Sequence, residues 1–329
     1  MGESCAEPYC FETVKADLRI KAIKACRLKK VNGTTTTIIS ILLEVKLQNS
    51  KPKNALTVDV EDYFQVEAFA SSILPADWPK YTPRVENNVE RVLELFNRYQ
   101  TKATFFILGW VAEKFPQLTR QIADAGHEIG CHGFLHQHIR RQSPEQFRED
   151  VRHARQLLME QTGVPVYCYR APSFSITNET LWALDILVQE GFRIDSSIFP
   201  ARHDLYGIPN APRFPYRRNG LIEFPPTTIH KANVSIGVAG GGYLRLFPYV
   251  FTRWAIRKIN ESEGQPVMVY FHPWEIDPGQ PRIAAPLKSR LRHYTNLGKM
   301  QYKIERLLKD FMFSTVSDVC SAANLLGAR

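Results

Sequence analysis

Residues 54–62 read Asn-Ala-Leu-Thr-Val-Asp-Val-Glu-Asp, a short apolar strand that runs directly into a cluster of three carboxylates. The change in character at residue 54 is abrupt, because residues 1–53 show no strand alternation and no capped helix. In parallel βα proteins, polar side chains at the carboxyl ends of strands converge on one edge of the sheet. We therefore take this stretch as the first strand of the fold and the beginning of a site.

The same unit recurs along the chain as far as residue 271. Short apolar segments alternate with amphipathic segments, which indicates a βα repeat and a parallel sheet or barrel. Helix starts and stops are marked by Pro116, by the pair Ser143-Pro144 and by glycines. The pattern predicts strands at 56–60, 103–108, 127–131, 166–169, 192–195 and 267–271, and helices at 84–99, 116–125, 143–163 and 177–190.

The organisation predicted from these patterns has three parts. Residues 1–53 form a poorly ordered N-terminal extension. Residues 54–275 form the main domain, which becomes loop-rich from about residue 200 because six prolines between 200 and 226 and three consecutive glycines at 240–242 weaken the alternation there. Residues 276–329 form a basic C-terminal extension packed on the barrel, with a helix near 297–309, a strand at 311–315 and a closing helix.

The net charge of +9 comes largely from two segments. Residues 15–30 carry seven Lys/Arg against one Asp, and residues 282–309 carry eight against one Glu. Solvated surface is one interpretation, and attraction to a polyanionic glycan or an anionic membrane face is the other. Nucleic acid is not an expected partner, because no recognised binding motif accompanies the charge.

The location expected from the sequence is cytoplasmic, since residues 1–30 lack the apolar stretch of a secretory signal. Six cysteines are too few for a disulfide scaffold in a chain of 329 residues. Three of them fall in the N-terminal extension. The others are expected to be buried thiols: Cys131, Cys168 and Cys320.

Two motifs carry candidate metal ligands. Asp59, Glu61 and Asp62 place three carboxylates within four residues, an arrangement that is costly unless a cation offsets the repulsion. His132 and His136 are four residues apart and can point the same way from a helical turn. Each motif alone also fits an ordinary acidic turn or a structural histidine pair, but together a carboxylate and two imidazoles leave open positions on a divalent metal.

Three further strand ends supply the rest of a hydrolytic site. Arg170 could hold a carboxylate ionised through a bidentate pair, or form a purely structural ion pair. His272 follows the strand at 267–271 and suits a general acid, with a capped core histidine as the alternative. Asp195 lies at another strand end, where a hydrogen bond to His272 would raise the pKa of the imidazole. At the same edge, the residues expected to contact substrate are Pro172, Phe174, Tyr270 and Trp274. Trp274 and Glu275 could add an aromatic sugar platform or a polar contact, with packing an equal possibility for both.

With these motifs in order, the chain resembles the polysaccharide deacetylases of the NodB-homology group, carbohydrate esterase family four, over roughly residues 54–275. More narrowly, it resembles the exosortase-associated exopolysaccharide branch, which carries an extra C-terminal region, here about residues 200–329. The stretches that carry the narrower resemblance are Asp-Val-Glu-Asp-Tyr-Phe at 59–64, Tyr-Arg-Ala-Pro-Ser-Phe-Ser at 169–175, Asp-Ser-Ser-Ile at 195–198 and His-Pro-Trp-Glu at 272–275.

The resemblance implies a distorted (β/α) barrel that removes acetyl groups from an N-acetylated sugar with one divalent metal ion, zinc being the expected species. It implies that Asp59 is the base, Arg170 its orienting partner, His272 the acid and Asp195 the residue that tunes it. His132 and His136 would bind the metal. The expected partners are an N-acetylated glycan and the exopolysaccharide machinery at the membrane surface.

Two departures from the family pattern bear on these roles. Val60 follows Asp59 where the family has adjacent aspartates, so the carboxylate ligand is Glu61 or Asp62. We favour Glu61, because a one-residue skip keeps it on the same side of an extended segment as Asp59. Gly133 and Gln137 stand where Ser or Thr and Pro are common.

Two other functions fit the same residues. One is hydrolysis of another C–N bond, such as a cyclic imide or a small amide. The other is a barrel without activity that binds glycan or scaffolds an export complex, which is disfavoured because no acid, base or ligand position is lost.

Overall fold

β1 (Asn54–Val60) is the strand around which the fold is organised, and it is buried along its whole length. The structure is a computed structural model that describes residues 53–203, 206–231 and 234–326. The extension expected at 1–53 lies outside these residues, apart from Lys53.

The nine-stranded sheet has the order β10-β1-β2-β3-β4-β5-β7-β6, with β11 pairing with β1 off this path. All pairings are parallel except β6 with β7. The strands are β1, β2 (Thr104–Ile107), β3 (Glu128–Cys131), β4 (Cys168–Tyr169), β5 (Ile194–Asp195), β6 (Tyr216–Arg218), β7 (Leu221–Glu223), β10 (Met268–Phe271) and β11 (Phe313–Ser314), and a separate hairpin joins β8 (Thr228–Lys231) to β9 (Val234–Gly237).

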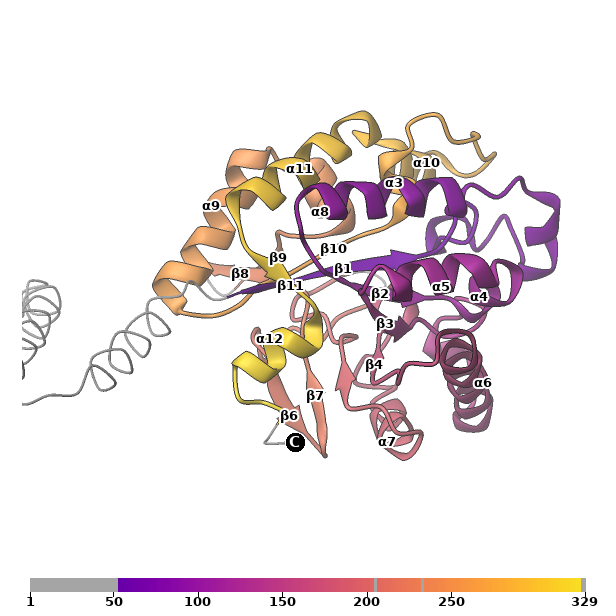
Figure 1. Ribbon diagram of the computed structural model, residues 1–329, viewed down its shortest axis with the longest axis horizontal. Coiled ribbons are helices and arrows are strands. Elements are labelled where there is room, and N and C mark those ends of the chain that lie inside the picture. The colour runs from indigo at the N-terminus through magenta and orange to yellow at the C-terminus, as the bar shows by residue number, and fades with distance from the viewer. Residues whose placement is uncertain (1–52, 204–205, 232–233, 327–329) are drawn as a thin grey trace, which may run out of the picture. The chain divides into compact units, whose positions relative to one another are not determined.

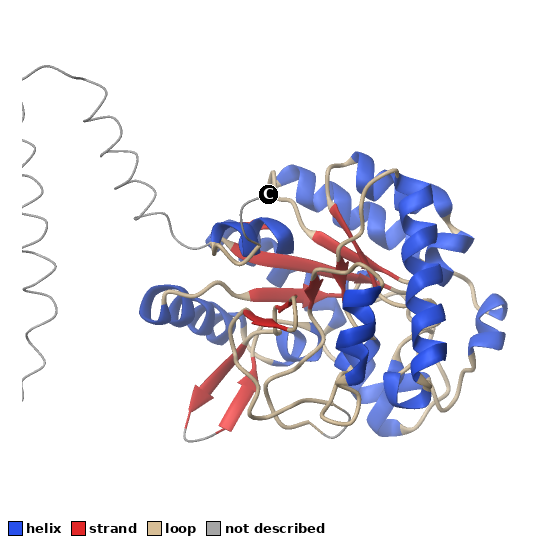
Figure 2. Cartoon of the chain, turned by 90° about the horizontal axis from the view of Figure 1, so that it is seen from below, coloured by secondary structure: helices blue, strands red, loops and turns tan. Residues whose placement is uncertain are grey.

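Helices pack around this sheet, and all but a few lie on its outer face, whereas α12 lies on the concave side (Figures 1 and 2). They are α3 (Val85–Arg98), α4 (Gly109–Lys114), α5 (Pro116–Asp124), α6 (Pro144–Thr162), α7 (Trp182–Gln189), α8 (Gly241–Leu246), α9 (Tyr249–Lys258), α10 (Leu287–Tyr294), α11 (Met300–Asp310) and α12 (Val316–Ala322). The result is an α/β fold with a curled half-barrel sheet, which confirms the predicted fold class.

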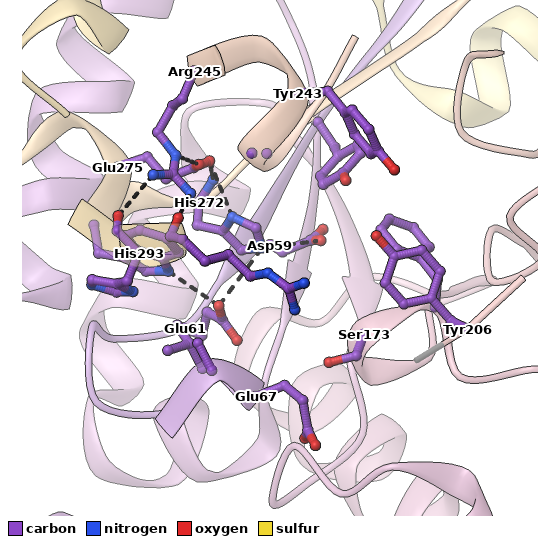
Figure 3. A pocket seen from close by; sticks show the side chains of 18 of the residues that line it. Asp59, Glu61, Glu67, Ser173, Tyr206, Tyr243, Arg245, His272, Glu275 and His293 are labelled. Carbon is purple, nitrogen blue, oxygen red and sulfur yellow. Dashed lines mark hydrogen bonds and ion pairs between the residues drawn. The ribbon is translucent and has the colours of Figure 1, made fainter. Parts of the chain in front are cut away.

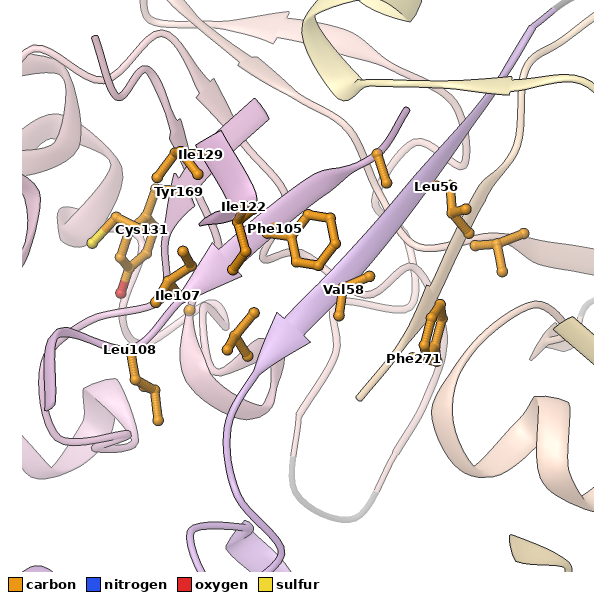
Figure 4. Packing of buried hydrophobic residues seen from close by; sticks show 14 of the residues in the cluster. Leu56, Val58, Phe105, Ile107, Leu108, Ile122, Ile129, Cys131, Tyr169 and Phe271 are labelled. Atoms are coloured by element: carbon orange, nitrogen blue, oxygen red, sulfur yellow. The ribbon is translucent and has the colours of Figure 1, made fainter. Parts of the chain in front are cut away.

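The two faces of β1 pack against different parts of the core. Leu56 and Val58 point outward beneath the helices, together with Phe105 and Ile107 of β2 (Figure 4). The opposite face begins with Ala55, which belongs to an inner cluster closed by residues of α12. Because side chains alternate along a strand, this inner face leads from Ala55 to polar residues at the carboxyl end of β1.

α6 begins and ends at the residues that the sequence predicts. The Ser143 hydroxyl accepts from the Gln146 backbone N–H while the Gln146 side chain accepts from the Ser143 N–H, a reciprocal capping box that precedes Pro144. The helix ends at Gly163, which adopts φ +68°, a left-handed conformation favoured by glycine. By contrast, α7 begins at Trp182 rather than at Thr177 or Asn178, because the Thr180 hydroxyl closes a turn by accepting from the Thr177 N–H.

The segment at 200–265 is more regular than its prolines and glycines suggest. Its described residues form four strands, two α-helices and a short π-helix at Ile259–Glu263, and β7 extends the main sheet by pairing with β5. The helix, strand and closing helix predicted after residue 297 are confirmed, since a 3-10 turn at Leu297–Lys299 leads into α11, β11 and α12. β11 pairs with Asn54 and Ala55, so residues 313–314 lie beside the start of β1.

Two further findings concern the cysteines and the length of the helices. Cys131, Cys168 and Cys320 are buried free thiols, as predicted. None of the helices in the described part of the chain is both long enough and apolar enough to cross a membrane.

Candidate active site

The carboxyl ends of four strands bring the predicted side chains into one pocket (Figure 3). Asp59 lies at the end of β1, His132 follows β3, Arg170 follows β4 and His272 follows β10. Asp59, His132 and His272 line the pocket, whereas Arg170 is fully buried beneath it.

Glu61, His132 and His136 form a group that could hold a metal ion. One ligand atom from each residue lies within 4.8 Å of the others, and all three residues are buried. Oε2 of Glu61 is 2.8 Å from Nε2 of His136. Two imidazoles and one carboxylate suit a divalent ion with open coordination positions.

The backbone around His132 selects the imidazole form that binds a metal. Nδ1 of His132 lies 2.8 Å from the Arg170 carbonyl oxygen. Because a carbonyl only accepts, Nδ1 carries the proton and Nε2 presents its lone pair. Burial lowers the pKa of His132 to about 4, so the ring is neutral near pH 7. Burial would raise the pKa of Glu61, but His136 and His272 hold it well below its usual value.

The histidine pair lies on a bent loop, and the expected helical turn is absent at 132–136. Gly133 and His136 both have positive φ, +73° and +52°. A Cβ at Gly133 would lie 2.9 Å from Oδ2 of Asp150, the oxygen that accepts from the Phe134 N–H. The glycine that departs from the family pattern is therefore required by the loop that aims the two imidazoles.

Asp62 does not join the metal group. Its carboxylate accepts from the backbone N–H groups of Tyr63, Arg84 and Val85, at 2.8, 2.6 and 3.0 Å. These contacts hold the start of α3, so Asp62 has a structural role. The choice between the two carboxylates falls on Glu61, whose side chain lies on the pocket side with Asp59.

Arg170 and Asp59 form a buried ion pair with Nη1 to Oδ1 at 2.6 Å. The same nitrogen donates to the Thr57 hydroxyl at 2.8 Å, and Nη2 donates to the Ser196 hydroxyl at 2.9 Å. The pair is therefore not the bidentate one expected, because the guanidinium distributes its donors over four residues, Asp59, Thr57, Ser196 and Met268. The other carboxylate oxygen of Asp59, Oδ2, faces the pocket and lies 3.8 Å from Nε2 of His272.

His272 is held by Glu275, for which the sequence indicated only a polar contact or packing. Nδ1 lies 3.1 Å from Oε2 of Glu275, and Nε2 lies 3.6 Å from Oε1 of Glu61. Burial lowers the pKa of His272, but the carboxylates of Glu61, Glu275 and Asp59 outweigh it and raise the pKa to about 9. The His-Pro-x-Glu spacing is that of a capping box, a signal that could have identified Glu275.

The prediction that Asp195 hydrogen-bonds His272 is wrong. Asp195 accepts from the Ser197 hydroxyl and lies in register with Glu223 on the neighbouring strand. The reason is topological, because β5 and β10 are separated by four strands in the sheet. Burial raises the pKa of Asp195 to about 6.

Of the four expected substrate contacts, Phe174, Tyr270 and Trp274 line the pocket, whereas Pro172 is buried where it opens a 3-10 helix. Trp274 offers no open face, because it stacks on His272 at 5.2 Å and on His293 at 4.1 Å between ring centroids. Its Nε1 donates to Oε1 of Glu61 at 3.1 Å. Five other lining residues come from later segments of the chain and were not predicted, namely Tyr206, Tyr243, Arg245, Arg292 and His293.

Comparisons with known proteins agree with this architecture. Residues 76–191 match the model of the family described as "Polysaccharide deacetylase", and residues 196–321 match a "Domain of unknown function" (DUF3473). The chain is 32% identical to "Peptidoglycan deacetylase" of Helicobacter pylori over 34% of its own length and 38% of the relative. It is 31% identical to "Peptidoglycan-N-acetylglucosamine deacetylase" of Bacillus cereus over 29% of its length and 35% of the relative.

The chain thus spans little more than a third of these relatives. A solved structure from Mycobacterium smegmatis, described as a candidate polysaccharide deacetylase, covers 84% of this chain and 92% of its own, with 19% identity and a TM-score of 0.55. That likeness shows the fold. Residues 76–191 are therefore similar in sequence to polysaccharide deacetylases, and the described chain shares the fold of one solved structure.

Proposed function

We propose that the protein is a metal-dependent hydrolase that removes N-acetyl groups from N-acetylated sugars of a glycan and releases acetate. The observation that carries this proposal is the convergence of three groups in one pocket: the possible metal ligands, the Asp59–Arg170 pair and His272. The names of the curated relatives, which refer to peptidoglycan deacetylation, support an N-acetylated sugar as the substrate.

Glu61, His132 and His136 would hold the metal ion, and their mixed nitrogen and oxygen donors suit zinc. A divalent ion bound there would polarise the amide carbonyl and lower the pKa of the attacking water. The three residues keep the site ready by presenting a neutral imidazole and an ionised carboxylate at short range.

Asp59 acts as the general base in this proposal. Arg170 binds Oδ1 and fixes the carboxylate, while Oδ2 faces the pocket and takes the proton of the attacking water. His272 acts as the general acid and protonates the leaving sugar nitrogen from Nε2. The products are acetate and a free amine.

The substrate would enter along a wall of aromatic side chains. Tyr206 and Tyr243 lie on the side of the pocket opposite His293 (Figure 3), and Phe174 and Tyr270 also line it. Sugar rings pack well against such faces, since they present C–H groups to the π-system. An exopolysaccharide or its precursor remains our proposed glycan, and we propose that residues 54–275 and 276–329 act as one catalytic unit.

We also propose a cytoplasmic location peripheral to a membrane. Apolar side chains are exposed on α8 and α10, including Leu246, Leu287 and Leu291. The segments 241–258 and 278–304 contain Lys and Arg but no Asp or Glu. Exposed apolar and basic side chains together favour an anionic lipid surface.

Vesicle sedimentation tests this location. Vesicles containing phosphatidylglycerol should retain the protein, and the double variant Leu287→Ser, Leu291→Ser should release it. Leu74→Ser is the control, since Leu74 belongs to neither α8 nor α10 and its exposed fraction, 62%, lies between those of Leu287, 68%, and Leu291, 59%. Equal retention of both variants would contradict the proposal.

Acetate release from N-acetylglucosamine oligomers, with and without chelator and with metal content measured in parallel, tests the activity. We expect release that a chelator abolishes. Metal binding without acetate release would indicate that the substrate is another amide. Protein that binds no metal would refute the proposed chemistry.

A further inference from the structure

The region that matches a domain of unknown function, residues 196–321, contains His272 and most of the side chains around it. We propose that Arg245 and Glu275 are positioning residues for His272, so that this region completes the active site of the deacetylase domain. The inference rests on the proposed function, in which His272 is the acid.

Glu275 determines how the imidazole is held. Its Oε2 accepts from the His272 backbone N–H at 3.0 Å and lies 3.1 Å from Nδ1 of the same residue. Since a carboxylate only accepts, Nδ1 donates to Glu275 and Nε2 is left facing Asp59 and Glu61. One buried carboxylate thus fixes both the position of the ring and the nitrogen that meets the substrate.

Arg245 fixes Glu275 in turn. Nε donates to Oε1 of Glu275 at 2.6 Å, as Figure 3 shows. The other guanidinium nitrogens donate to the carbonyls of Arg292, His293 and Thr295, at 2.9, 2.7 and 3.0 Å. These carbonyls lie at the end of α10, where a helix leaves acceptors unpaired and carries partial negative charge. The guanidinium is therefore held by four acceptors in one orientation.

The backbone of Arg245 is held as firmly as its side chain. Nζ of Lys303 donates to the carbonyls of Leu244, Arg245 and Phe247, all between 2.8 and 2.9 Å. The Asn296 amide also donates to the Arg245 carbonyl, at 3.1 Å. Helices α8, α10 and α11 are thereby tied together around a single guanidinium.

The electrostatics give Arg245 a specific task. Burial would raise the pKa of Glu275, but Arg245 and His272 keep it below its usual value. Without the guanidinium, a buried carboxylate would lose its countercharge and the imidazole would lose a fixed acceptor. Lysine cannot replace the arginine fully, because the planar fork is what reaches a carboxylate and three carbonyls at once.

Steady-state kinetics on the full-length protein test the inference. Arg245→Met and Glu275→Gln should lower kcat by roughly 10- to 100-fold, the usual effect of removing an outer partner of a reacting side chain, while KM and metal content stay within about twofold. Arg213→Met is the matched control, because Arg213 also pairs with a glutamate, Glu263, and a backbone carbonyl in the same region but away from the pocket. It should leave kcat unchanged.

A spectroscopic measurement separates this inference from the proposed function. The imidazole ¹⁵N resonances of His272 should shift in both variants and stay in place in Arg213→Met. If the unmodified protein releases no acetate, the proposed function fails, and the resonances alone decide the inference. Near-isosteric Glu275→Gln keeps the test valid if Arg245→Met does not fold. Unchanged kcat, or unchanged resonances, in folded Glu275→Gln would overturn the inference.

Discussion

The two halves of the site place a buried arginine behind Asp59, the proposed base, and behind His272, the proposed acid, but the supporting contacts differ. Asp59 and Arg170 project from the ends of β1 and β4 into the barrel interior. His272 is supported through Glu275 by Arg245, which comes from the short helix α8. The first half depends on parallel strands, whereas the second depends on contacts among helices that follow the barrel.

This difference has a physical consequence. Strand ends converge in any parallel sheet, so the first half needs only the correct residues at the correct register. The second half needs Lys303 and Asn296 to hold α8, since a six-residue helix has little stability of its own. The acid side of the site should therefore depend on distant residues more than the base side does.

The largest expected effect tests whether both halves are needed for the reaction. Asp59→Ala and His272→Ala should each lower kcat by roughly 10²- to 10⁴-fold, because each removes a proton-transfer group. Metal content should stay nearly unchanged in both variants, whereas His132→Ala should lose metal as well as activity. Loss of metal in Asp59→Ala or His272→Ala would contradict the assigned roles.

The sequence predicts the first half better than the second for the same reason. Alternation along β1 placed Glu61 beside Asp59, and strand ends identified His132, Arg170 and His272. Asp195 was misassigned, because strand order cannot be read from a single sequence and β5 lies far from β10 in the sheet. Arg245 has no local signal at all, since its partners lie 30 to 50 residues away.

The next effect concerns stability and compares a buried ion pair with a half-buried one. Arg170→Met should lower the free energy of unfolding by about 3–5 kcal/mol, because Asp59 would keep a buried charge without its partner. Arg213→Met should cost only about 0–1 kcal/mol, since Arg213 and Glu263 remain partly in contact with water. Urea unfolding of the two variants measures the difference, and equal losses would refute this view of the barrel interior.

A smaller effect tests the acid pair that replaced the expected Asp195–His272 contact. Asp195 and Glu223 face each other on β5 and β7, with Arg170 and Tyr216 nearby, and burial raises the pKa of both carboxyls, that of Asp195 to about 6. The folded protein therefore binds more protons than the unfolded chain above about pH 4. The contribution of Asp195 and Glu223 to the free energy of unfolding therefore falls as the pH rises through 6.

Glu223→Gln should reduce that pH dependence. The amide can accept from Ser197 and Ile198 as the carboxylate does, and it carries no charge opposite Asp195. Urea unfolding between pH 5 and 8 should show a shallower loss of stability in the variant. The comparison isolates the pair, since Asp62 and Asp150, whose pKa values burial also raises to about 6, titrate in both proteins.

The smallest effect compares two glycines with nearly the same backbone conformation. Gly133 and Gly163 have φ of +73° and +68°, so alanine should cost about 1 kcal/mol of strain at either position. A Cβ at Gly163 meets nothing within 4 Å, whereas one at Gly133 meets the Asp150 carboxylate that anchors the histidine loop. Gly163→Ala should therefore lower stability alone, and Gly133→Ala should lower stability and weaken metal binding as well. Metal titration by calorimetry separates the two outcomes. Equal metal affinities would mean that the loop can move without displacing His132 and His136. Metal binding would then not require the backbone conformation that Gly133 adopts in the structure.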